Sequence, residues 1–457
     1  MSILHPDQRQ QLVERAVQIS TERGGKTQFV GTRRSDFESL GRWVQENLSS
    51  TCAAILADAR TLVLEGHQVQ ALLADAGLLV HVHQVDDDDN GRPPISSTRL
   101  GKSIAQAIAL HGVDLVISVG GGTMTDLGKI AARELSLPHI AVATAASMNG
   151  FTSSLAAVLD EGVKMTSPAP APIAVFASPS TLRAAPASRS ASGRGDLHSK
   201  PVSSADWRLA HLLNDAPWDL PVVALLDEIS ELMDGVAAGL RDDIEDAYGQ
   251  LFAGLCLTGV AMQSATKGSQ ASGAEHLVSH YLDMIAGCRS FEHEASTHGA
   301  QVAVGCMVAL EAWDFVLTKL KAGAEFGPIP GYLLDEGQRQ AWIEGHFREL
   351  SPSIAAMHAK APTPNRTREA RRARIGAEWS SLLTDCASLL RTRESLEREL
   401  LAAGCATRFS ELGVDASRAR DAIRYAPWVR ARYTVLHMID ELGWYDEFVE
   451  RALEATR

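Results

Sequence analysis

The sequence predicts an α/β domain with a parallel sheet over residues 1–185, followed by an all-helical domain over residues 186–457. Two observations predict the first domain: short apolar runs that suit buried strands, and helix-like segments between them. Strands that alternate with helices form a parallel sheet through right-handed crossovers. A third observation predicts the second domain, because Ala, Leu, Glu and Arg dominate beyond residue 186 and β-branched runs are few.

The elements follow in order. An amphipathic helical segment is expected up to about residue 50, and four apolar runs after it are expected to be strands, at 53–56, 78–82, 115–119 and 140–143. A series of prolines from Pro168 to Pro186 marks the end of the α/β domain. The stretch 321–375 is richer in Pro, Gly and charge and is expected to be a surface insertion. Its arginines at 367–374 are expected on a solvated helix face rather than in a binding patch.

The composition excludes several classes of protein. The formal charge of -13 argues against a nucleic-acid-binding surface, which needs clustered Lys and Arg. The chain has no run of some 18 consecutive apolar residues, and its polar N-terminus does not resemble a signal peptide, so no membrane span is expected. The six cysteines are scattered without a CxxC pair, which is typical of reduced thiols and predicts a cytoplasmic protein. The sequence leaves homodimer formation open.

A glycine triplet follows the third expected strand directly. Gly120, Gly121 and Gly122 precede Thr123 and Asp126, at the point where a helix is expected to begin. Glycines at a strand end allow close backbone approach, and the amides and positive dipole end of the next helix favour a pyrophosphate. The triplet is not a GxGxxG motif, and a plain strand–helix turn is the alternative.

Small hydroxyl residues follow the fourth expected strand, from Thr144 through Ser147 to Ser153. In open parallel sheets ligands bind at the carboxyl edge of the strands, where such residues often contact a cofactor. Turn and capping chemistry is an equal alternative for this stretch.

The helical half contains candidate metal ligands, namely Asp196, His276, His280, His293 and His298. His276 and His280 are four residues apart and therefore share one helix face. An Asp with two His residues suits a divalent metal that keeps an open position for a substrate.

Together these motifs closely resemble the glycerol-1-phosphate dehydrogenases, within the wider group of glycerol dehydrogenase, iron-type alcohol dehydrogenases and dehydroquinate synthase. The matching stretches span most of the chain in order: 114–129, 137–148, 160–175, 195–200 with 206–207, 272–280, 298–305 and 430–436. The resemblance implies a dehydroquinate synthase-like fold, with a dinucleotide-binding α/β domain and a helical metal- and substrate-binding domain.

The resemblance also implies roles for individual residues. Asp58 would hold the adenosine ribose, and the cofactor NAD or NADP would contact Gly120, Gly121, Gly122, Thr123, Asp126, Thr144, Ser147 and Ser153. Asp196, His276 and His298 would bind one metal ion, zinc or nickel. Asp196 and His280 would act in catalysis and contact the substrate.

The function that follows is metal-assisted hydride transfer between NAD(P) and a small polyol phosphate, with dihydroxyacetone phosphate reduced to glycerol 1-phosphate. Lys200 and Arg432 are candidate phosphate contacts, although a structural ion pair explains each equally well. A sugar-phosphate cyclase and a non-catalytic binding protein on the same fold are alternatives. Asp196 favours the dehydrogenase, because the cyclases typically have Glu there, and no metal ligand is missing.

Two features depart from the family pattern. The family usually has Asp where this chain has Asn149, a position expected to contact the substrate. The spacing between His276 and His298 is longer than usual and contains His293. We expect His298 to be the metal ligand, because it precedes Gly299 and an apolar helix-like run.

Overall fold

The computed structural model describes residues 3–88, 90–233, 235–264, 272–286, 296–360 and 363–457. The chain forms two compact units that alternate along the sequence. Unit 1 comprises residues 1–197 and 219–266, and unit 2 comprises residues 198–218 and 267–457. The expected single boundary near residue 185 does not coincide with these units, because helices from beyond residue 185 pack in unit 1.

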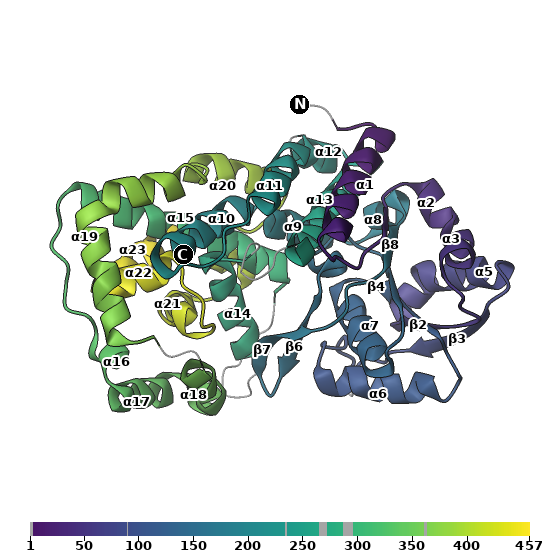
Figure 1. Cartoon of the computed structure of the whole chain (residues 1–457), viewed down its shortest axis with the longest axis horizontal. Coiled ribbons are helices and arrows are strands. Elements are labelled where there is room, and N and C mark those ends of the chain that lie inside the picture. Colours follow the sequence, from purple (N-terminus) through teal and green to yellow (C-terminus); the bar gives the residue numbers. More distant parts are fainter. Residues whose placement is uncertain (1–2, 89, 234, 265–271, 287–295, 361–362) are drawn as a thin grey trace. The chain divides into compact units, whose positions relative to one another are not determined.

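Unit 1 contains a six-stranded parallel sheet with the strand order β1-β8-β5-β4-β2-β3 (Figure 1). Its strands are β1 (Phe29–Gly31), β2 (Cys52–Ala57), β3 (Leu79–Gln84), β4 (Leu115–Gly120), β5 (His139–Ala143) and β8 (Ala174–Ala177). The strands β6 (Leu155–Asp160) and β7 (Val163–Pro168) form a separate antiparallel hairpin. The parallel sheet and its α/β setting confirm the predicted fold class.

Helices cover both faces of this sheet, because side chains along each strand point alternately to opposite sides. Ala53 and Ile55 pack on one side with residues of α2 (Arg34–Glu38), α3 (Leu40–Asn47) and α5 (His67–Asp75). Ala54 and Leu56 pack on the other side with residues of α6 (Thr98–Ala109) and α7 (Gly122–Leu135). The strands β2, β4, β5 and β8 are therefore buried on both faces and consist mostly of apolar residues, whereas the edge strand β3 is half-exposed.

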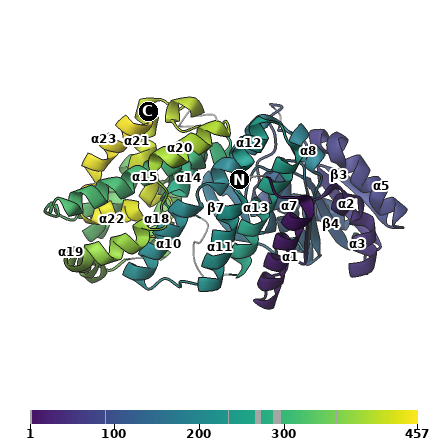
Figure 2. The ribbon, with the colours of Figure 1, turned by 90° about the horizontal axis from the view of Figure 1, so that it is seen from above.

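The remaining helices of unit 1 flank this sandwich. They are α1 (Pro6–Glu22), α4 (Ala59–Thr61), α8 (Pro179–Ala184), α9 (Ala187–Leu197), α11 (Leu220–Leu232), α12 (Val236–Arg241) and α13 (Glu245–Ser264), with the short turns η1 (Leu62–Gly66) and η2 (Gly150–Thr152). Helices α1 and α13 lie side by side although more than 200 residues separate them in the sequence (Figures 1 and 2).

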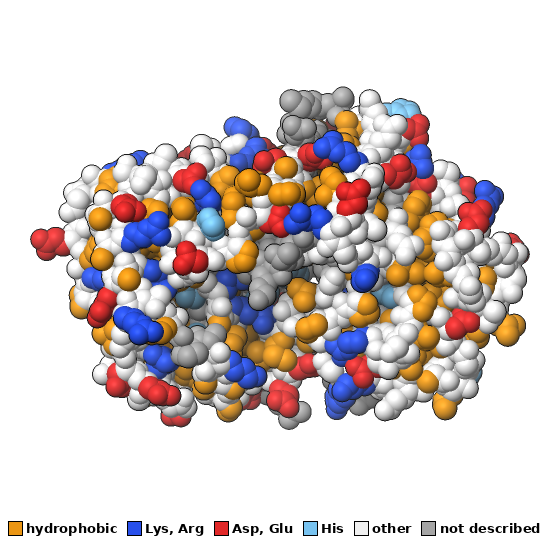
Figure 3. Space-filling model, viewed as in Figure 1, with side chains coloured by type: hydrophobic (Ala, Val, Ile, Leu, Met, Phe, Trp, Pro, Cys, Tyr) orange, Lys and Arg blue, Asp and Glu red, His pale blue; other side chains and the backbone are white. Residues whose placement is uncertain are grey.

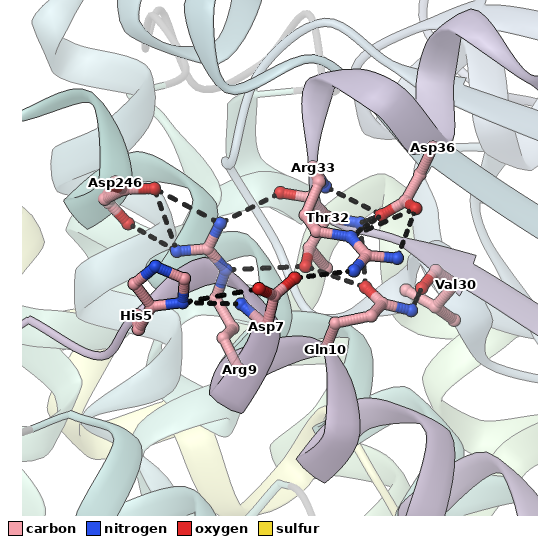
Figure 4. A network of polar contacts seen from close by, with 9 residues as sticks. All are labelled: His5, Asp7, Arg9, Gln10, Val30, Thr32, Arg33, Asp36 and Asp246. Carbon is pink, nitrogen blue, oxygen red and sulfur yellow. Dashed lines mark hydrogen bonds and ion pairs between the residues drawn. The ribbon is translucent and has the colours of Figure 1, made fainter.

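A buried arginine fastens α1 to its neighbours (Figure 4). The guanidinium of Arg9 donates to the Asp246 carboxylate and carbonyl, at 3.3 and 3.2 Å, and to the Thr32 carbonyl at 3.1 Å. Gln10 donates to the Val30 carbonyl at 2.9 Å. Since Thr32 follows β1 and Asp246 begins α13, these bonds join the first helix to the sheet edge and to a late helix.

Every regular element described in unit 2 is a helix, as predicted for this part of the chain. The helices are α10 (Lys200–Asn214), α14 (Ala274–Ala286), α15 (His298–Lys321), α16 (Gly331–Leu334), α17 (Glu336–Phe347), α18 (Ser351–Lys360), α19 (Asn365–Ala387), α20 (Arg393–Ala402), α21 (Ala416–Tyr425), α22 (Val435–Glu441) and α23 (Tyr445–Thr456). Three short 3₁₀ turns connect them: η3 (Arg348–Leu350), η4 (Phe409–Leu412) and η5 (Ala426–Trp428).

Helix α15 forms the centre of unit 2. By length and hydropathy it could cross a membrane, but 83% of its most apolar 18-residue window is buried inside the protein. A core helix passes the same test of length and composition. Burial of α15 against the other helices of unit 2 accounts for its apolar sequence.

The arginine-rich start of α19 is not a solvated face, which corrects the expectation from the sequence. Arg371 is buried and donates to the Glu441 carboxylate and to Asn214, while Arg368 is also buried. Arg372 donates to the carbonyl of Gly327 at 2.8 Å. These arginines form hydrogen bonds and an ion pair within unit 2. On the face shown in Figure 3, basic and acidic side chains are interspersed.

Candidate functional site

The first part of the candidate site lies in unit 1, where the direction of the strand order reverses. The chain passes from β2 to β3 on one side and then to β4 on the other side of β2. In such sheets ligands bind outside the carboxyl ends of the two strands at this switch point. Asp58 follows β2 and the glycine triplet ends β4, so the topology brings these predicted cofactor contacts to one place.

Two of the three glycines have a steric reason to lack a side chain, and the third borders open space. Gly120 has φ +155°, and a Cβ there would lie 2.6 Å from Met124 Cγ. A Cβ on Gly122, the first residue of α7, would lie 2.9 Å from Met148 Sδ. A Cβ on Gly121 would have only Ser147 Oγ within 4 Å, at 3.8 Å. Space is therefore open at Gly121, beside the helix end whose amides and dipole favour an anion.

Asp58 caps the helix that follows β2. Its Oδ1 accepts from the amides of Arg60 and Thr61, both at 2.9 Å. The cap uses Oδ1, so the carboxylate can keep its second oxygen for a ligand hydroxyl. Arg60 Nε lies 3.6 Å from this carboxylate, and its guanidinium pairs with Asp87.

A buried lysine that the sequence analysis did not single out holds the loop after β5. Lys129 Nζ donates to the carbonyls of Gly150 and Leu155, at 2.6 and 2.9 Å, and lies 3.3 Å from Ser153 Oγ. Asp126 lies one helical turn before Lys129 and 3.5 Å from Nζ. Burial raises the pKa of Asp126, against the attraction of Lys129. Asp126 and Ser153 thus both contact the ammonium group of Lys129. In the sequence, the only sign of this contact is that Lys129 follows Asp126 by three residues, one turn of a helix.

The loop after β5 also meets α9. Thr144 donates its amide to the Gly120 carbonyl at 3.2 Å, which joins the two predicted cofactor segments. Ser192 Oγ donates to the Ser147 carbonyl at 3.0 Å. A Cβ on Gly193 would lie 2.0 Å from the Ala146 carbonyl oxygen, so only glycine permits this approach. The close packing places Asp196, at the end of α9, beside the same loop.

Asn149 holds Asp196 in a two-point contact. The Asn149 amide N donates to Asp196 Oδ2 at 2.7 Å, and its side-chain Nδ2 donates to Asp196 Oδ1 at 2.9 Å. Each carboxylate oxygen therefore accepts one hydrogen bond from residue 149. Asn149, expected from the resemblance to contact the substrate, orients a predicted metal ligand in this structure.

The second part of the candidate site lies in unit 2, where three histidines gather on α14 and at the start of α15. The ring centroids of His276 and His298 are 5.3 Å apart, and those of His276 and His280 are 6.0 Å apart. The two helices cross closely, since a Cβ on Gly305 would lie 2.2 Å from the Glu275 carbonyl oxygen. His293 lies outside the described residues.

Hydrogen-bond partners fix the protonation of two of these rings. Glu275 Oε1 lies 2.7 Å from His276 Nδ1, and a carboxylate can only accept, so Nδ1 carries the proton. Ser279 donates its hydroxyl to Gln301 at 2.8 Å, so its oxygen accepts from His298 Nδ1 at 3.1 Å. Both rings therefore present an unprotonated Nε2, the form in which imidazole binds a metal.

His280 has the opposite form. Arg430 Nε lies 3.4 Å from His280 Nδ1, and an arginine can only donate, so this nitrogen accepts. The neutral ring then carries its proton on Nε2 and can donate a hydrogen bond there. This pattern separates His280 from His276 and His298, a distinction that residue spacing cannot make.

A buried charge cluster, which sequence reasoning missed, supports the histidine helix. Asp206 accepts from the amides of Ala274 and Val435, at 2.7 and 2.9 Å, and so caps both α14 and α22. Burial, reinforced by Glu275, raises the pKa of Asp206 to about 8. Arg432 is partly buried; burial lowers its pKa to about 10, while Glu275 and Asp206 counter this. Arg432 thus lies under the influence of two carboxylates and donates to the Ser272 carbonyl, and Lys200 is buried with Nζ 3.1 Å from Ser199 Oγ.

Comparisons with known proteins place the chain in a family. Residues 33–186 match the model of iron-containing alcohol dehydrogenases. The chain is 31% identical over 403 residues to a glycerol-1-phosphate dehydrogenase (NAD(P)+) of Geobacillus stearothermophilus, covering 85% of this chain and 86% of the relative. It is 34% identical over 320 residues to a protein of the same name from Geobacillus thermodenitrificans, covering 69% and 75%.

Solved structures show the same fold. A probable glycerol dehydrogenase from Sinorhizobium meliloti matches with a TM-score of 0.59 at 16% identity, covering 93% of this chain and 98% of that one. Glycerol dehydrogenase from Schizosaccharomyces pombe matches with a TM-score of 0.58 at 15% identity, covering 94% and 91%. The predicted fold, family and enzyme class are therefore confirmed, and the chain belongs to the glycerol-1-phosphate dehydrogenase family of NAD(P)-linked oxidoreductases.

Proposed function

We propose that this enzyme uses NADH or NADPH to reduce dihydroxyacetone phosphate to glycerol 1-phosphate, or acts on a closely related polyol phosphate. The relatives that span most of the chain carry this activity in their names. The observation that supports it most directly is the protonation pattern of the histidines in unit 2. His276 and His298 have an unprotonated Nε2 that can bind a metal, and His280 has a protonated Nε2 that can donate a hydrogen bond.

The residues fit one divalent metal ion. Nε2 of His276 and of His298 would serve as two ligands, and the carboxylate of Asp196 would serve as the third. One carboxylate and two imidazoles form a donor set typical of catalytic zinc, and they also suit nickel. When bound, such an ion withdraws electron density from the substrate carbonyl and stabilises the negative charge that develops on its oxygen.

The other residues of the site position the reactants. The His280 Nε2–H would donate to a substrate oxygen, where a hydrogen bond strengthens as negative charge develops. Asp58 would hold the adenosine ribose, and the open space at Gly121 would receive the pyrophosphate. Arg60, beside Asp58, would allow a 2′-phosphate as well as a 2′-hydroxyl, which fits use of both NAD and NADP.

The test is a coupled measurement of metal content and turnover. Enzyme freed of metal with a chelator is assayed for NADH and NADPH oxidation with dihydroxyacetone phosphate, before and after addition of zinc or nickel. We expect activity to disappear with the metal and to return with it. Full activity in the metal-free protein would overturn the proposal, and conversion of a seven-carbon keto acid phosphate without net NAD turnover would indicate a cyclase instead.

We also propose that the enzyme is cytoplasmic. Cys52, Cys256 and Cys386 are free thiols in the structure, which suits a reducing compartment. Fractionation of the source cells with an antibody to this chain tests this directly. Recovery of the protein outside the cytoplasm would contradict it.

A further inference from the structure

A cavity in unit 2 lies beside the side chain that contacts His280. Its volume is about 330 Å³, within the range of small-molecule sites. It is lined by Asp206, Trp207, Ala210, Asn214, Ala216, Ser272, Arg430, Ala431, Arg432 and Tyr433. Arg430 therefore faces two ways, toward His280 through Nε and into the cavity.

Most polar groups on the cavity wall already have partners. The Asp206 carboxylate accepts from two helix amides, and Arg432 donates to the Ser272 carbonyl. Asn214 accepts from Arg371 at 2.7 Å, and Tyr433 donates to Glu441 at 3.0 Å. These residues form the wall and are committed to the fold of unit 2.

Two groups on the same wall differ from the rest. Nη2 of Arg430 and Oγ of Ser272 are both buried, and neither has a hydrogen-bond partner among the described residues. A buried donor without a partner costs free energy, so such groups mark places where a ligand completes the bonding. An arginine and a hydroxyl are also a suitable pair for a phosphate, which offers several acceptor oxygens.

The charge around Arg430 leads to the same conclusion. Burial is the main cause that lowers its pKa, to about 10, and the neighbouring Arg432 adds to the effect. The side chain thus remains a cation at neutral pH. Arg432 has Glu275 and Asp206 as counter-charges, whereas the described part of the chain provides no carboxylate in an ion pair with Arg430. A partly buried cation with a buried Nη2, next to another cation, favours an anion as its partner.

We propose that Arg430 and Ser272 form the subsite that binds the phosphate group of the substrate, while His280 donates to an oxygen at its reacting end. This inference rests on the proposed function for the identity of the substrate. It assigns the phosphate to Arg430 rather than to Arg432 or Lys200, the two candidates from the sequence. It also explains how one arginine links recognition of the phosphate to the orientation of the catalytic imidazole.

The test compares a phosphorylated substrate with its phosphate-free analogue. Arg430→Gln, Arg430→Lys and Ser272→Ala are assayed with dihydroxyacetone phosphate and with dihydroxyacetone. Arg420→Gln serves as the control, because Arg420 makes an exposed ion pair with Glu450. We expect Arg430→Gln to lower the preference for the phosphorylated substrate at least tenfold, the size of a lost charged hydrogen bond. Ser272→Ala should lower it several-fold, and Arg420→Gln should leave it unchanged.

A second measurement separates this inference from the proposed function. The affinity of the metal-loaded wild-type enzyme and of Arg430→Gln for inorganic phosphate is measured by titration calorimetry, without turnover. Weaker phosphate binding by the variant would support the subsite even if the wild type failed to reduce dihydroxyacetone phosphate. Equal phosphate affinity of the two proteins, or an equal loss of kcat with both substrates, would overturn the proposed phosphate subsite. Arg430 would then act only by orienting His280.

Discussion

The contact between Asn149 and Asp196 separates two roles for residue 149. In Asn149→Leu the backbone amide can still donate to Asp196 Oδ2, but the side-chain bond to Oδ1, 2.9 Å long, is lost. Hydrogen bonds to charged groups contribute about 1.5–3 kcal/mol, and loss of a group that orients a metal ligand typically weakens metal binding about 10–100-fold. We therefore expect the metal dissociation constant to rise within that range.

The assay is a competition for zinc between the metal-free enzyme and a chromophoric chelator. Ser154→Ala is a matched control, since this exposed residue lies in the same loop. Asn149→Asp, which introduces the residue usual in the family, removes the same side-chain donor but adds a negative charge that attracts the cation, so it should weaken metal binding less than Asn149→Leu does. Unchanged metal affinity in both variants, with a raised KM for the substrate, would refute the positioning role and return Asn149 to direct substrate contact.

Three further predictions follow from the structure. His276→Ala should lose bound metal, whereas His280→Ala should retain it and lose kcat, as measured by elemental analysis and steady-state kinetics. Lys129→Met should lower Tm and weaken NAD(P)H binding, because breaking a buried ion pair costs about 3–5 kcal/mol. Asp440→Asn should remove a pH dependence of stability. Burial raises the folded-state pKa of Asp440 to about 7, so the free energy of unfolding of the wild type should fall by about 1.4 kcal/mol per pH unit, relative to the variant, as the pH rises from about 4 to about 7.

Each of these has a result that would contradict it. Loss of metal from both histidine variants would show that His280 is also a ligand. A Lys129→Met protein that melts like the wild type would mean that the ammonium group does not hold the loop after β5. For Asp440, urea denaturation at pH 5 and pH 7.5 decides, because Asn keeps a partner for the Tyr332 hydroxyl but cannot ionise. A constant difference between the two proteins at both values would refute the titration.

The sequence predicted β2, β4 and β5 because each is a continuous apolar run that is buried on both faces, and it predicted the half-exposed edge strand β3 from the apolar run at 78–82. It missed β1 and β8, which lie at residues 29–31 and 174–177. With three and four residues, these strands are too short to show a hydrophobic period. They are strands because β1 pairs with β8, a segment more than 140 residues away in the sequence. The hairpin of β6 and β7 was also missed, although β6 begins with the apolar run 155–159; its partner β7 is mostly polar and exposed and has no such run.

The candidate site divides in the same way. Glycines, an Asp after a strand and histidines four apart are visible as local patterns. The partners that decide their protonation are not, because Arg430 acts on His280 across 150 residues and Asn149 acts on Asp196 across 47. Glu275 is adjacent to His276, yet only the geometry shows that its carboxylate faces that ring. The identity of the ligands could thus be inferred from the sequence, whereas their orientation could not.

The alternation of the two units along the chain has a consequence for synthesis on the ribosome. The sheet is complete at Ala177, but α13, which packs on α1 and bonds to Arg9, ends only at Ser264. A nascent chain in which the last strand of the sheet has just emerged therefore still lacks α13, the helix that packs on α1. Unit 1 cannot finish folding until residues 198–218, which belong to unit 2, have also emerged. Domains generally fold as units during translation, so there is a long interval of synthesis in which the apolar side of α1 is not yet covered by α13.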